Sequence, residues 1–215
     1  MRLLVLGATG RTGREVVRQA LATGHDVTAF VRDPAGLAIS DARLAVVTGD
    51  ARNADDLRRA VAGQDAVISA LGGRAKDDLL NSLGGKPDGT MRRSFEALIQ
   101  AADAAGVRRV VVLSTFMLAS NFKAGLLRPI APFFKAMNDD KRVAEEALAR
   151  SALDWTIVYA TRLTDGERSG RERLVPVTEI VTPRNTVSRS DAAAFLLNQL
   201  DDAASVRKSL VVTAA

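Results

Sequence analysis

A glycine-rich turn near the N-terminus is the strongest chemical signal in this sequence. Gly7, Gly10 and Gly13 follow a G-x-x-G-x-x-G spacing, directly after an apolar run and directly before an amphipathic stretch. Glycine permits a tight turn and lets the backbone approach a ligand closely. The helix that follows would offer free N–H groups and the positive end of its dipole. The spacing therefore predicts a binding site for the pyrophosphate of a dinucleotide, with a purely structural strand-to-helix turn as the alternative.

The end of the second strand-like run carries the residue that distinguishes two nicotinamide cofactors. An acidic residue about 20 residues beyond the glycine turn would bind the ribose hydroxyls of NAD, whereas arginine accommodates the 2′-phosphate of NADP. The chain has Arg32 there and Arg11 in the turn as a second cation, although Asp33 follows at once. A guanidinium forms paired, charge-assisted hydrogen bonds with phosphate. The sequence thus favours NADP(H) over NAD(H).

Short apolar runs alternate with longer amphipathic segments along the chain. The runs predict strands over residues 3–6, 27–31, 44–48, 66–70, 110–113, 155–159 and 210–213. The amphipathic segments predict helices over 13–22, 91–105, 141–150 and 192–200, and a further helix after the capping residue Asn53. Ser188 to Asp191 resembles a capping box. Paired acidic residues at 55–56, 77–78, 139–140 and 201–202 are interpreted as helix starts or loop surface.

This order of elements predicts a single α/β domain of the Rossmann type, with a doubly wound parallel sheet covered on both faces. The domain would span residues 1–215, and the part from 160 to 215 would contribute to the substrate side. Ligands of such sheets bind beyond the carboxyl ends of the strands. Residues 72–90 and 116–138 lack regularity, and the second stretch is apolar enough to form either a pocket wall or a packed helix.

Composition narrows the function further. The 215 residues include no cysteine, which excludes disulfides and zinc–cysteine sites, and His25 is the only histidine, which argues against a histidine triad or a multi-histidine metal site. The net charge is +5, but the 30 Lys and Arg residues are scattered and aromatic residues make up 4%, so nucleic-acid binding is not expected. No apolar run is long enough to span a membrane. A cytoplasmic location and a monomer are the default expectations.

Several segments together resemble the atypical short-chain dehydrogenase/reductases. They are LLVLGATGRTG, VTAFVRDP, VVTGDARNADDLRRAVAGQDAVISALG, GVRRVVVLST and DDKRVAEEALARSALDWTIV, and they cover nearly the whole chain. Within that group the sequence is most similar to the NmrA-like NAD(P)H-binding branch that includes biliverdin-IXβ/flavin reductase. The resemblance implies cofactor contacts at Gly7, Thr9, Gly10, Arg11, Thr12, Gly13, Arg32, Asp50, Ala51, Ala70, Leu71, Gly72, Ser114, Thr115 and Lys141.

The chain departs from the superfamily at its proton donor. Standard members place Tyr and Lys in a Y-x-x-x-K arrangement, in which tyrosine protonates a carbonyl oxygen as hydride arrives. Here Met137 stands four residues before Lys141, and methionine cannot transfer a proton. Tyr159, the only tyrosine, ends the sixth predicted strand and could reach the crevice from another direction. Arg162 stands where some flavin-reductase relatives carry a histidine.

Two functions remain open. The first is an NADPH-dependent reductase that transfers hydride to a flavin, quinone or similar flat, conjugated small molecule, with the cofactor carrying the difficult chemistry. Ser114 and Lys141 would be its catalytic residues, and Phe116, Met117 and Arg162 would bind the substrate. Each of these also has a structural interpretation as strand end, surface or core. The second function is a catalytically inactive NADP(H)-binding regulator of the NmrA type, which the missing tyrosine motivates.

Overall fold

The computed structural model describes residues 1–72, 89–120, 122, 135–176 and 178–214. Within these ranges, no helix is both long and apolar enough to cross a membrane. Predictions that fall on 73–88 and 123–134, which include the acidic pair at 77–78 and most of the two irregular stretches, lie outside the described residues. The side chain of Met137 also lies outside them.

A central sheet organises the described part of the chain. Its strands, in spatial order, are β3 (Leu44–Thr48), β2 (Asp26–Val31), β1 (Arg2–Leu6), β4 (Ala66–Ser69), β5 (Arg109–Thr115), β6 (Asp154–Ala160), β10 (Lys208–Ala214) and β8 (Glu172–Leu174). All neighbours pair in parallel except β10 and β8. A second, two-stranded sheet joins β7 (Arg162–Thr164) to β9 (Thr186–Ser188). The predicted Rossmann-type architecture is confirmed.

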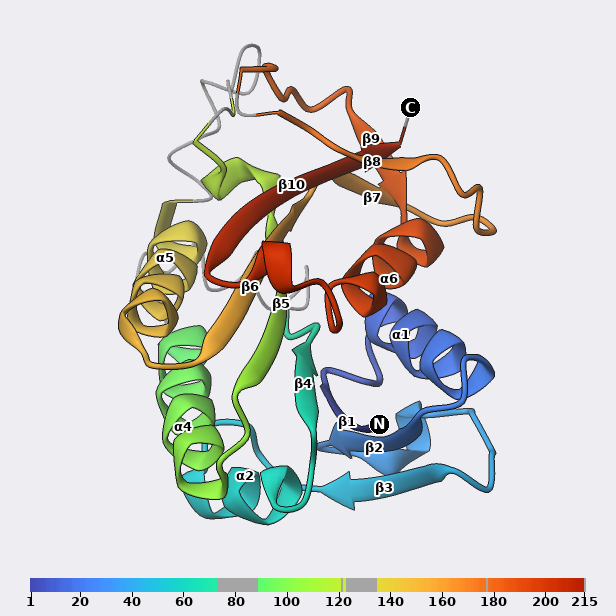
Figure 1. The fold of residues 1–215 in the computed structure, drawn as a ribbon, viewed down its shortest axis with the longest axis vertical. Coiled ribbons are helices and arrows are strands. Elements are labelled where there is room, and N and C mark those ends of the chain that lie inside the picture. The colour runs from blue at the N-terminus through green and yellow to red at the C-terminus, as the bar shows by residue number, and fades with distance from the viewer. Residues whose placement is uncertain (73–88, 121, 123–134, 177, 215) are drawn as a thin grey trace.

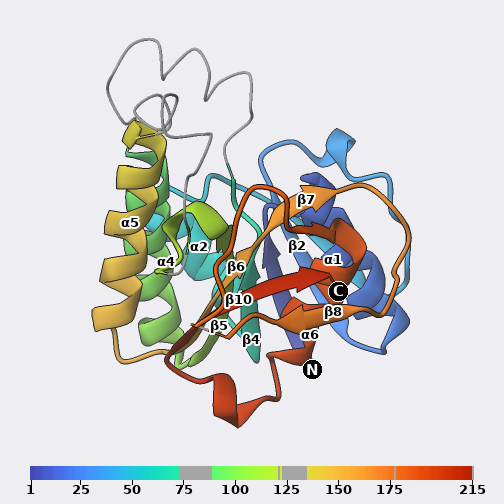
Figure 2. The ribbon, with the colours of Figure 1, turned by 90° about the horizontal axis from the view of Figure 1, so that it is seen from above.

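Helices cover both faces of the sheet (Figures 1 and 2). One face carries α1 (Arg11–Ala22) and α6 (Arg189–Asn198), and the other carries α2 (Ala54–Val61), α4 (Thr90–Ala105) and α5 (Lys135–Arg150). Side chains alternate along a strand, so Leu3 and Val5 pack under α1 and α6 while Leu4 and Leu6 pack under α2 and α4. This double burial explains why the first strand is a continuous apolar run rather than an alternating one.

The strand order reverses between β1 and β4. From β1 the chain passes through α1 to β2 and β3 on one side, and then returns to β4, β5 and β6 on the other. The glycine turn after β1 and the segment after β4 therefore lie side by side at the carboxyl ends of the strands. This is the point at which doubly wound sheets bind their ligands.

Most predicted elements match the structure to within about two residues, but some do not. Helix α5 begins at Lys135 rather than at residue 141, so its first turns lie in the stretch that lacked regularity in the sequence. Helix α6 runs from Arg189 to Asn198, three residues earlier at its start than predicted. The strands β7, β8 and β9 were not predicted, because three half-exposed residues are too few to show an apolar alternation.

The capping predictions hold, with two corrections. Asn53 caps α2 by accepting from the N–H groups of Asp55 and Asp56 at 2.9 and 3.3 Å. Ser188 caps α6, but the Asp191 carboxylate binds Ser169 and Gly170 of a distant loop in addition to the Ser188 hydroxyl. The pair at 139–140 is not a helix start: Asp140 lies inside α5, is buried, and accepts from the N–H of Met91 at the start of α4.

Candidate functional site

The glycine turn can be built only from glycine at two of its positions. Gly7 has a φ of +76°, and a Cβ there would lie 2.6 Å from the carbonyl oxygen of Ala70 after β4. A Cβ on Gly13, in the first turn of α1, would lie 2.1 Å from the carbonyl oxygen of Gly7. The N–H of Gly10 closes the turn by donating to that same oxygen at 2.9 Å. The turn is therefore packed tightly between the segment after β4 and the first turn of α1, so that residues 7–13 contact residues 70–71.

The N-terminus of α1 has no side-chain cap. Gly10 is its N-cap residue, with no side-chain hydrogen bond and no acidic residue in the first turn, whereas α2 and α6 are capped by Asn53 and Ser188. The first N–H groups of a helix need acceptors from outside the helix. Phosphate oxygens satisfy both this requirement and the positive end of the dipole. The residues present therefore fit the pyrophosphate of a dinucleotide.

The loop after β2 lies against the glycine turn. Arg32 follows directly after the last residue of β2 and is exposed. A Cβ on Gly36 would lie 3.2 Å from the Thr9 side chain, so the loop passes close to residues 7–13. Asp33, which complicated the choice of cofactor, accepts from the N–H of Ala35 at 3.0 Å within its own loop. One oxygen of its carboxylate is therefore engaged by the backbone of the loop.

Asp50, expected beside the adenine, lies after β3 next to Arg52. The Nε of Arg52 donates to Oδ1 and Oδ2 of Asp50, each at 3.0 Å. These hydrogen bonds lower the pKa of the Asp50 carboxyl, and the charge of Arg32 lowers it further. Arg32 and Asp50 are therefore close enough to interact, since they follow the neighbouring strands β2 and β3 at the same edge of the sheet. Ala51, predicted to lie beside the adenine as well, is half-buried and follows Asp50 directly.

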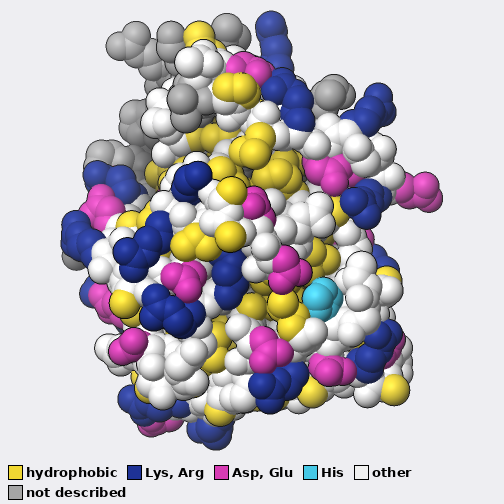
Figure 3. Space-filling view, in the orientation of Figure 1, with side chains coloured by type: hydrophobic (Ala, Val, Ile, Leu, Met, Phe, Trp, Pro, Cys, Tyr) yellow, Lys and Arg dark blue, Asp and Glu magenta, His cyan; other side chains and the backbone are white. Residues whose placement is uncertain are grey.

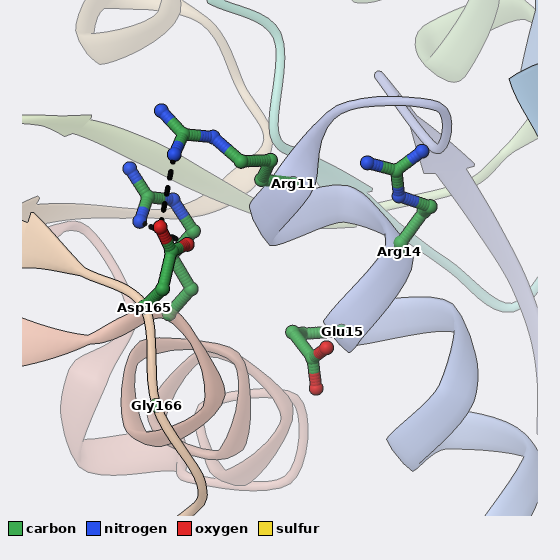
Figure 4. Close-up of a pocket in the computed structure, with 6 residues that line it drawn as sticks. Arg11, Arg14, Glu15, Asp165 and Gly166 are labelled. Carbon is green, nitrogen blue, oxygen red and sulfur yellow. Dashed lines mark hydrogen bonds and ion pairs between the residues drawn. The ribbon is translucent and has the colours of Figure 1, made fainter.

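Arg11, the second predicted cation, is held by a loop from the C-terminal part of the chain. Its Nη1 lies 3.1 Å from Oδ2 of Asp165, and Nη1 of Arg189 lies 2.7 Å from Oδ1 of the same carboxylate. The three side chains border a small cavity of about 200 Å³, which Arg14, Glu15 and Gly166 also line (Figure 4). Sequence reasoning missed Asp165, because its partner lies 154 residues away.

A buried hydrogen-bonded group lies at the carboxyl ends of β5 and β6. Ser114 and Tyr159 are register partners on these two strands. The Ser114 hydroxyl donates to Oε1 of Glu145 in α5, and the Tyr159 hydroxyl donates to Oε2 of the same carboxyl at 2.8 Å. Ser114 and Glu145 are each only 8% exposed. The structure thus brings the predicted Ser114 together with a tyrosine that had no assigned role and a glutamate that was missed.

The charge state of Glu145 depends on its burial. Removal from water raises the pKa of the Glu145 carboxyl, while the hydrogen bonds from Ser114 and Tyr159 and the charge of Lys141 act in the opposite direction. Burial and the neighbouring carboxyl likewise raise the pKa of Tyr159. Glu145 lies four residues after Lys141, one helical turn along α5. In the sequence, Glu145 stands beside Ala144 and Leu148, which form the buried face of this helix. A charged residue on such an apolar face could have indicated a functional side chain.

The three predicted substrate residues lie in different surroundings. Phe116 is buried against Val175, Val181 and Val211, and its ring meets Phe122 edge to face with centroids 5.2 Å apart. Met117 packs partly against this cluster, and the hydroxyl of the predicted cofactor contact Thr115 accepts from its N–H at 3.4 Å. Arg162, at the start of β7, is exposed. A substrate role for these residues stays a prediction.

Charged side chains are mixed over the face shown in Figure 3, where Lys and Arg alternate with Asp and Glu. In the described part of the chain, no group of three or more metal-ligating side chains converges on one point.

Comparison with known proteins supports the dinucleotide site. Residues 7–203 match a family described as NAD(P)H-binding. In sequence, the chain is 32% identical over 171 residues to the photosystem II assembly factor Ycf39 of Synechocystis sp., a match that covers 77% of this chain and 46% of that protein. The chain thus spans about half the length of this relative.

Solved structures share the fold. The anaerobillin reductase ChuY of Escherichia coli superposes with a TM-score of 0.74 at 22% identity, covering 99% of this chain and 96% of that one. A short-chain dehydrogenase/reductase of Veillonella parvula, solved in complex with NADP, gives a TM-score of 0.76 at 20% identity, covering 98% and 93%. At these identities the likeness concerns the fold.

Proposed function

The chain belongs to the NAD(P)H-binding family, and from this premise we propose that it is an NADPH-dependent reductase that passes hydride to a flat, conjugated acceptor such as a flavin or quinone. The observation that carries the proposal is the uncapped N-terminus of α1 behind a turn that accepts only glycine at Gly7 and Gly13. Bound NADPH would supply the hydride, and the protein would supply orientation and electrostatics.

Cofactor binding would use the whole edge where the parallel strands end. The N–H groups at the start of α1 would hold the pyrophosphate, with Thr9 and Thr12 lining the turn. Arg32 would bind the 2′-phosphate of NADP, and the hydrogen bond from Ala35 to Oδ1 of Asp33 holds that carboxylate to its own loop. Asp50 and Ala51 would lie beside the adenine, and Ala70, Leu71 and Gly72 along the ribose and pyrophosphate. Thr115 would lie near the nicotinamide.

The nicotinamide end would rely on Ser114 and Lys141. Ser114 is the penultimate residue of β5 and lies at the same edge of the sheet as the glycine turn, which supports its assignment to the reacting end of the cofactor. Lys141 would orient the ribose and keep positive charge near the developing negative charge of the acceptor. A conjugated acceptor fits this set because it spreads that charge over its ring, and so depends less on the tyrosine that Met137 replaces.

A second candidate is an NADP(H)-binding regulator without turnover. It is favoured by the hydrogen bond from Ser114 to Glu145, because a hydroxyl whose hydrogen is already committed to a buried carboxyl cannot also donate it to a substrate. The name of one relative, an assembly factor, points the same way. A cytoplasmic, monomeric protein remains part of the proposal in both cases.

The experiment that tests the proposal measures binding and turnover together. NADPH and NADH are titrated into the purified protein, and NADPH oxidation is followed with FMN, riboflavin and simple quinones in turn. We expect turnover with at least one acceptor, and a fall of about 10²-fold or more in Ser114→Ala with little change in NADPH affinity. Ser40→Ala, on the exposed surface, is the matched control.

Three results would be informative. Turnover that depends on Ser114 supports the reductase. Tight NADPH binding without turnover on any acceptor favours the regulator. Failure to bind either dinucleotide contradicts both.

A further inference from the structure

Ser114, Glu145 and Tyr159 form a buried hydrogen-bonded group near the carboxyl ends of β5 and β6. We propose that Glu145 stores a proton behind Ser114 and delivers it, through the Ser114 hydroxyl, to the acceptor as that acceptor takes up hydride. The inference rests on the proposed reductase function and adds the source of the proton.

The hydrogen-bond geometry allows Ser114 two states. When Glu145 is ionised, it can only accept, so Ser114 donates to Oε1 and Tyr159 donates to Oε2. When Glu145 is protonated on Oε1, that oxygen becomes a donor to Ser114 Oγ. The Ser114 hydrogen is then free to turn toward the crevice. One proton on Glu145 therefore changes Ser114 from a donor to Oε1 into an acceptor from Oε1–H, and its own hydrogen can then be donated toward the substrate.

Burial shifts the titration of Glu145 toward higher pH. Glu145 is 8% exposed, Ser114 from β5 and Tyr159 from β6 face it, and Lys141 lies one turn earlier on α5. Because burial penalises the carboxylate, the pKa of Glu145 is raised in spite of Lys141.

Several described charged groups on the neighbouring elements are exposed or engaged with other partners. On α4, which packs beside α5, Arg92 pairs with Glu96, and Arg93 and Asp103 are exposed. Arg109 lies at the opposite end of β5, where it binds the carbonyl oxygens of Asp154, Gln199 and Leu200. On α5 itself, Asp139 pairs with Arg142 and Asp140 caps α4. Among the described residues, the groups that lower the pKa of Glu145 against the effect of burial are Ser114, Tyr159 and Lys141.

The proposed step balances. Bound NADPH would supply a hydride, which is two electrons and one proton, to the acceptor and would itself be oxidised. The Ser114 O–H bond breaks, and its proton goes to the anionic atom that hydride addition creates on the acceptor. The Oε1–H bond of Glu145 breaks, and its proton restores the Ser114 hydroxyl. Glu145 remains as a carboxylate, and a proton from water restores it before the next turnover.

Tyr159 acts as a positioning residue in this scheme. Its hydroxyl anchors Oε2, which leaves Oε1 directed at Ser114. It also stabilises the carboxylate, so its removal is expected to raise the pKa of Glu145 further.

The first test uses the full chain without cofactor and follows the side-chain carboxyl carbons of ¹³C-labelled glutamate by NMR over a pH series. Glu145→Gln identifies the Glu145 signal, and Glu146→Gln is the matched control, since Glu146 is its exposed neighbour and pairs with Arg150. We expect the Glu145 midpoint above the ordinary glutamate value of about 4.3. It should rise further in Tyr159→Phe. A Glu145 midpoint at or below the ordinary value would overturn the proposal.

The second test is the pH dependence of turnover with the best acceptor. The wild-type rate should fall as pH rises through the Glu145 midpoint, because the protonated form is then lost. Glu145→Gln should be about 10²-fold slower and should lack this decline, while Glu146→Gln should keep both rate and profile. An unchanged pH profile in Glu145→Gln overturns the relay but leaves the reductase intact. Absence of turnover with every acceptor, despite NADPH binding, overturns the proposed function and the relay with it.

Discussion

Arg11, in the first turn of α1, forms an ion pair of 3.1 Å with Asp165, a residue 154 positions later in the loop that follows β7. The cation that the sequence assigns to the cofactor is therefore already engaged by a carboxylate, which also holds Arg189 (Figure 4). Both members of the pair are well exposed, at 63% and 70% of their side-chain surface. Exposed pairs of this kind are weak, so a phosphate could displace Asp165 from Arg11.

Asp165→Asn should tighten NADPH binding. Removing the carboxylate releases Arg11 for the cofactor, and an exposed ion pair of roughly 0.2–1 kcal/mol corresponds to a gain of up to about fivefold at low salt. Isothermal titration of NADPH at two ionic strengths measures this, and the gain should shrink at the higher one. Glu167→Gln removes one negative charge from the same exposed loop and should have little effect. If NADPH affinity rises equally in both variants, the cause is the change in net charge and not the release of Arg11.

Arg32→Ala should abolish the preference for NADP(H). A charge-assisted hydrogen bond contributes roughly 1.5–3 kcal/mol, so NADPH affinity should fall about 10- to 150-fold while NADH affinity changes little. Competitive titration of the two dinucleotides gives both constants. Arg58→Ala, on the exposed side of α2 where Arg58 pairs with Asp55, is the matched control. If NADH binds the wild type as tightly as NADPH, Arg32 does not select the cofactor.

Gly13→Ala should destabilise the fold and prevent dinucleotide binding. Alanine normally stabilises a helix interior relative to glycine, but here its Cβ would lie 2.1 Å from the Gly7 carbonyl oxygen. Overpacking of this kind costs roughly 1–3 kcal/mol, which lowers the Tm by about 2–12 °C. Thermal unfolding followed by circular dichroism measures the change. Gly72→Ala, whose Cβ would meet no atom within 4 Å, should leave the Tm near that of the wild type.

The titration of Glu145 should make the free energy of unfolding of the wild type depend on pH between acid and neutral values. Because the folded-state pKa is raised, the native protein binds more protons than the unfolded chain in the window from the ordinary glutamate pKa up to the raised one. The contribution of Glu145 is therefore fully present below that window and is lost as pH rises through it, by up to about 1.4 kcal/mol per pH unit.

Glu145→Gln should lack this loss. Urea unfolding at several pH values should show the stability of the variant rising relative to the wild type across the window. If the difference in the free energy of unfolding between the wild type and Glu145→Gln stays constant with pH, Glu145 has the same pKa in the folded and the unfolded chain.

The glycine turn and the parallel strands could be predicted because local patterns specify them. The apolar run Leu3–Leu6 needs burial on both faces, and the spacing of Gly7, Gly10 and Gly13 belongs to one kind of turn. The doubly wound order then follows from right-handed crossovers. The sequence therefore determined the fold class and the family, which the structure and the comparisons confirm. It also predicts that ligands bind at the carboxyl ends of the strands, and this stays a prediction.

The short strands β7, β8 and β9 and the early start of α5 escaped prediction for a physical reason. Three-residue strands and the first turns of a helix carry too few apolar positions to show a period. Their backbone is held instead by partners elsewhere, such as Thr213, which pairs with Arg173 of β8 across the sheet. Tertiary pairing, not local pattern, decides such segments.

Only the tertiary structure decided which side chains meet. Ser114, Glu145 and Tyr159 come from two strands and a helix, and none carries a local signal that names its partners. They meet because parallel register aligns Ser114 with Tyr159 and because α5 packs its buried face over the ends of both strands. The same holds for Arg11 and Asp165. A hydrogen bond depends on distance and direction in space, and these are fixed only when the elements pack.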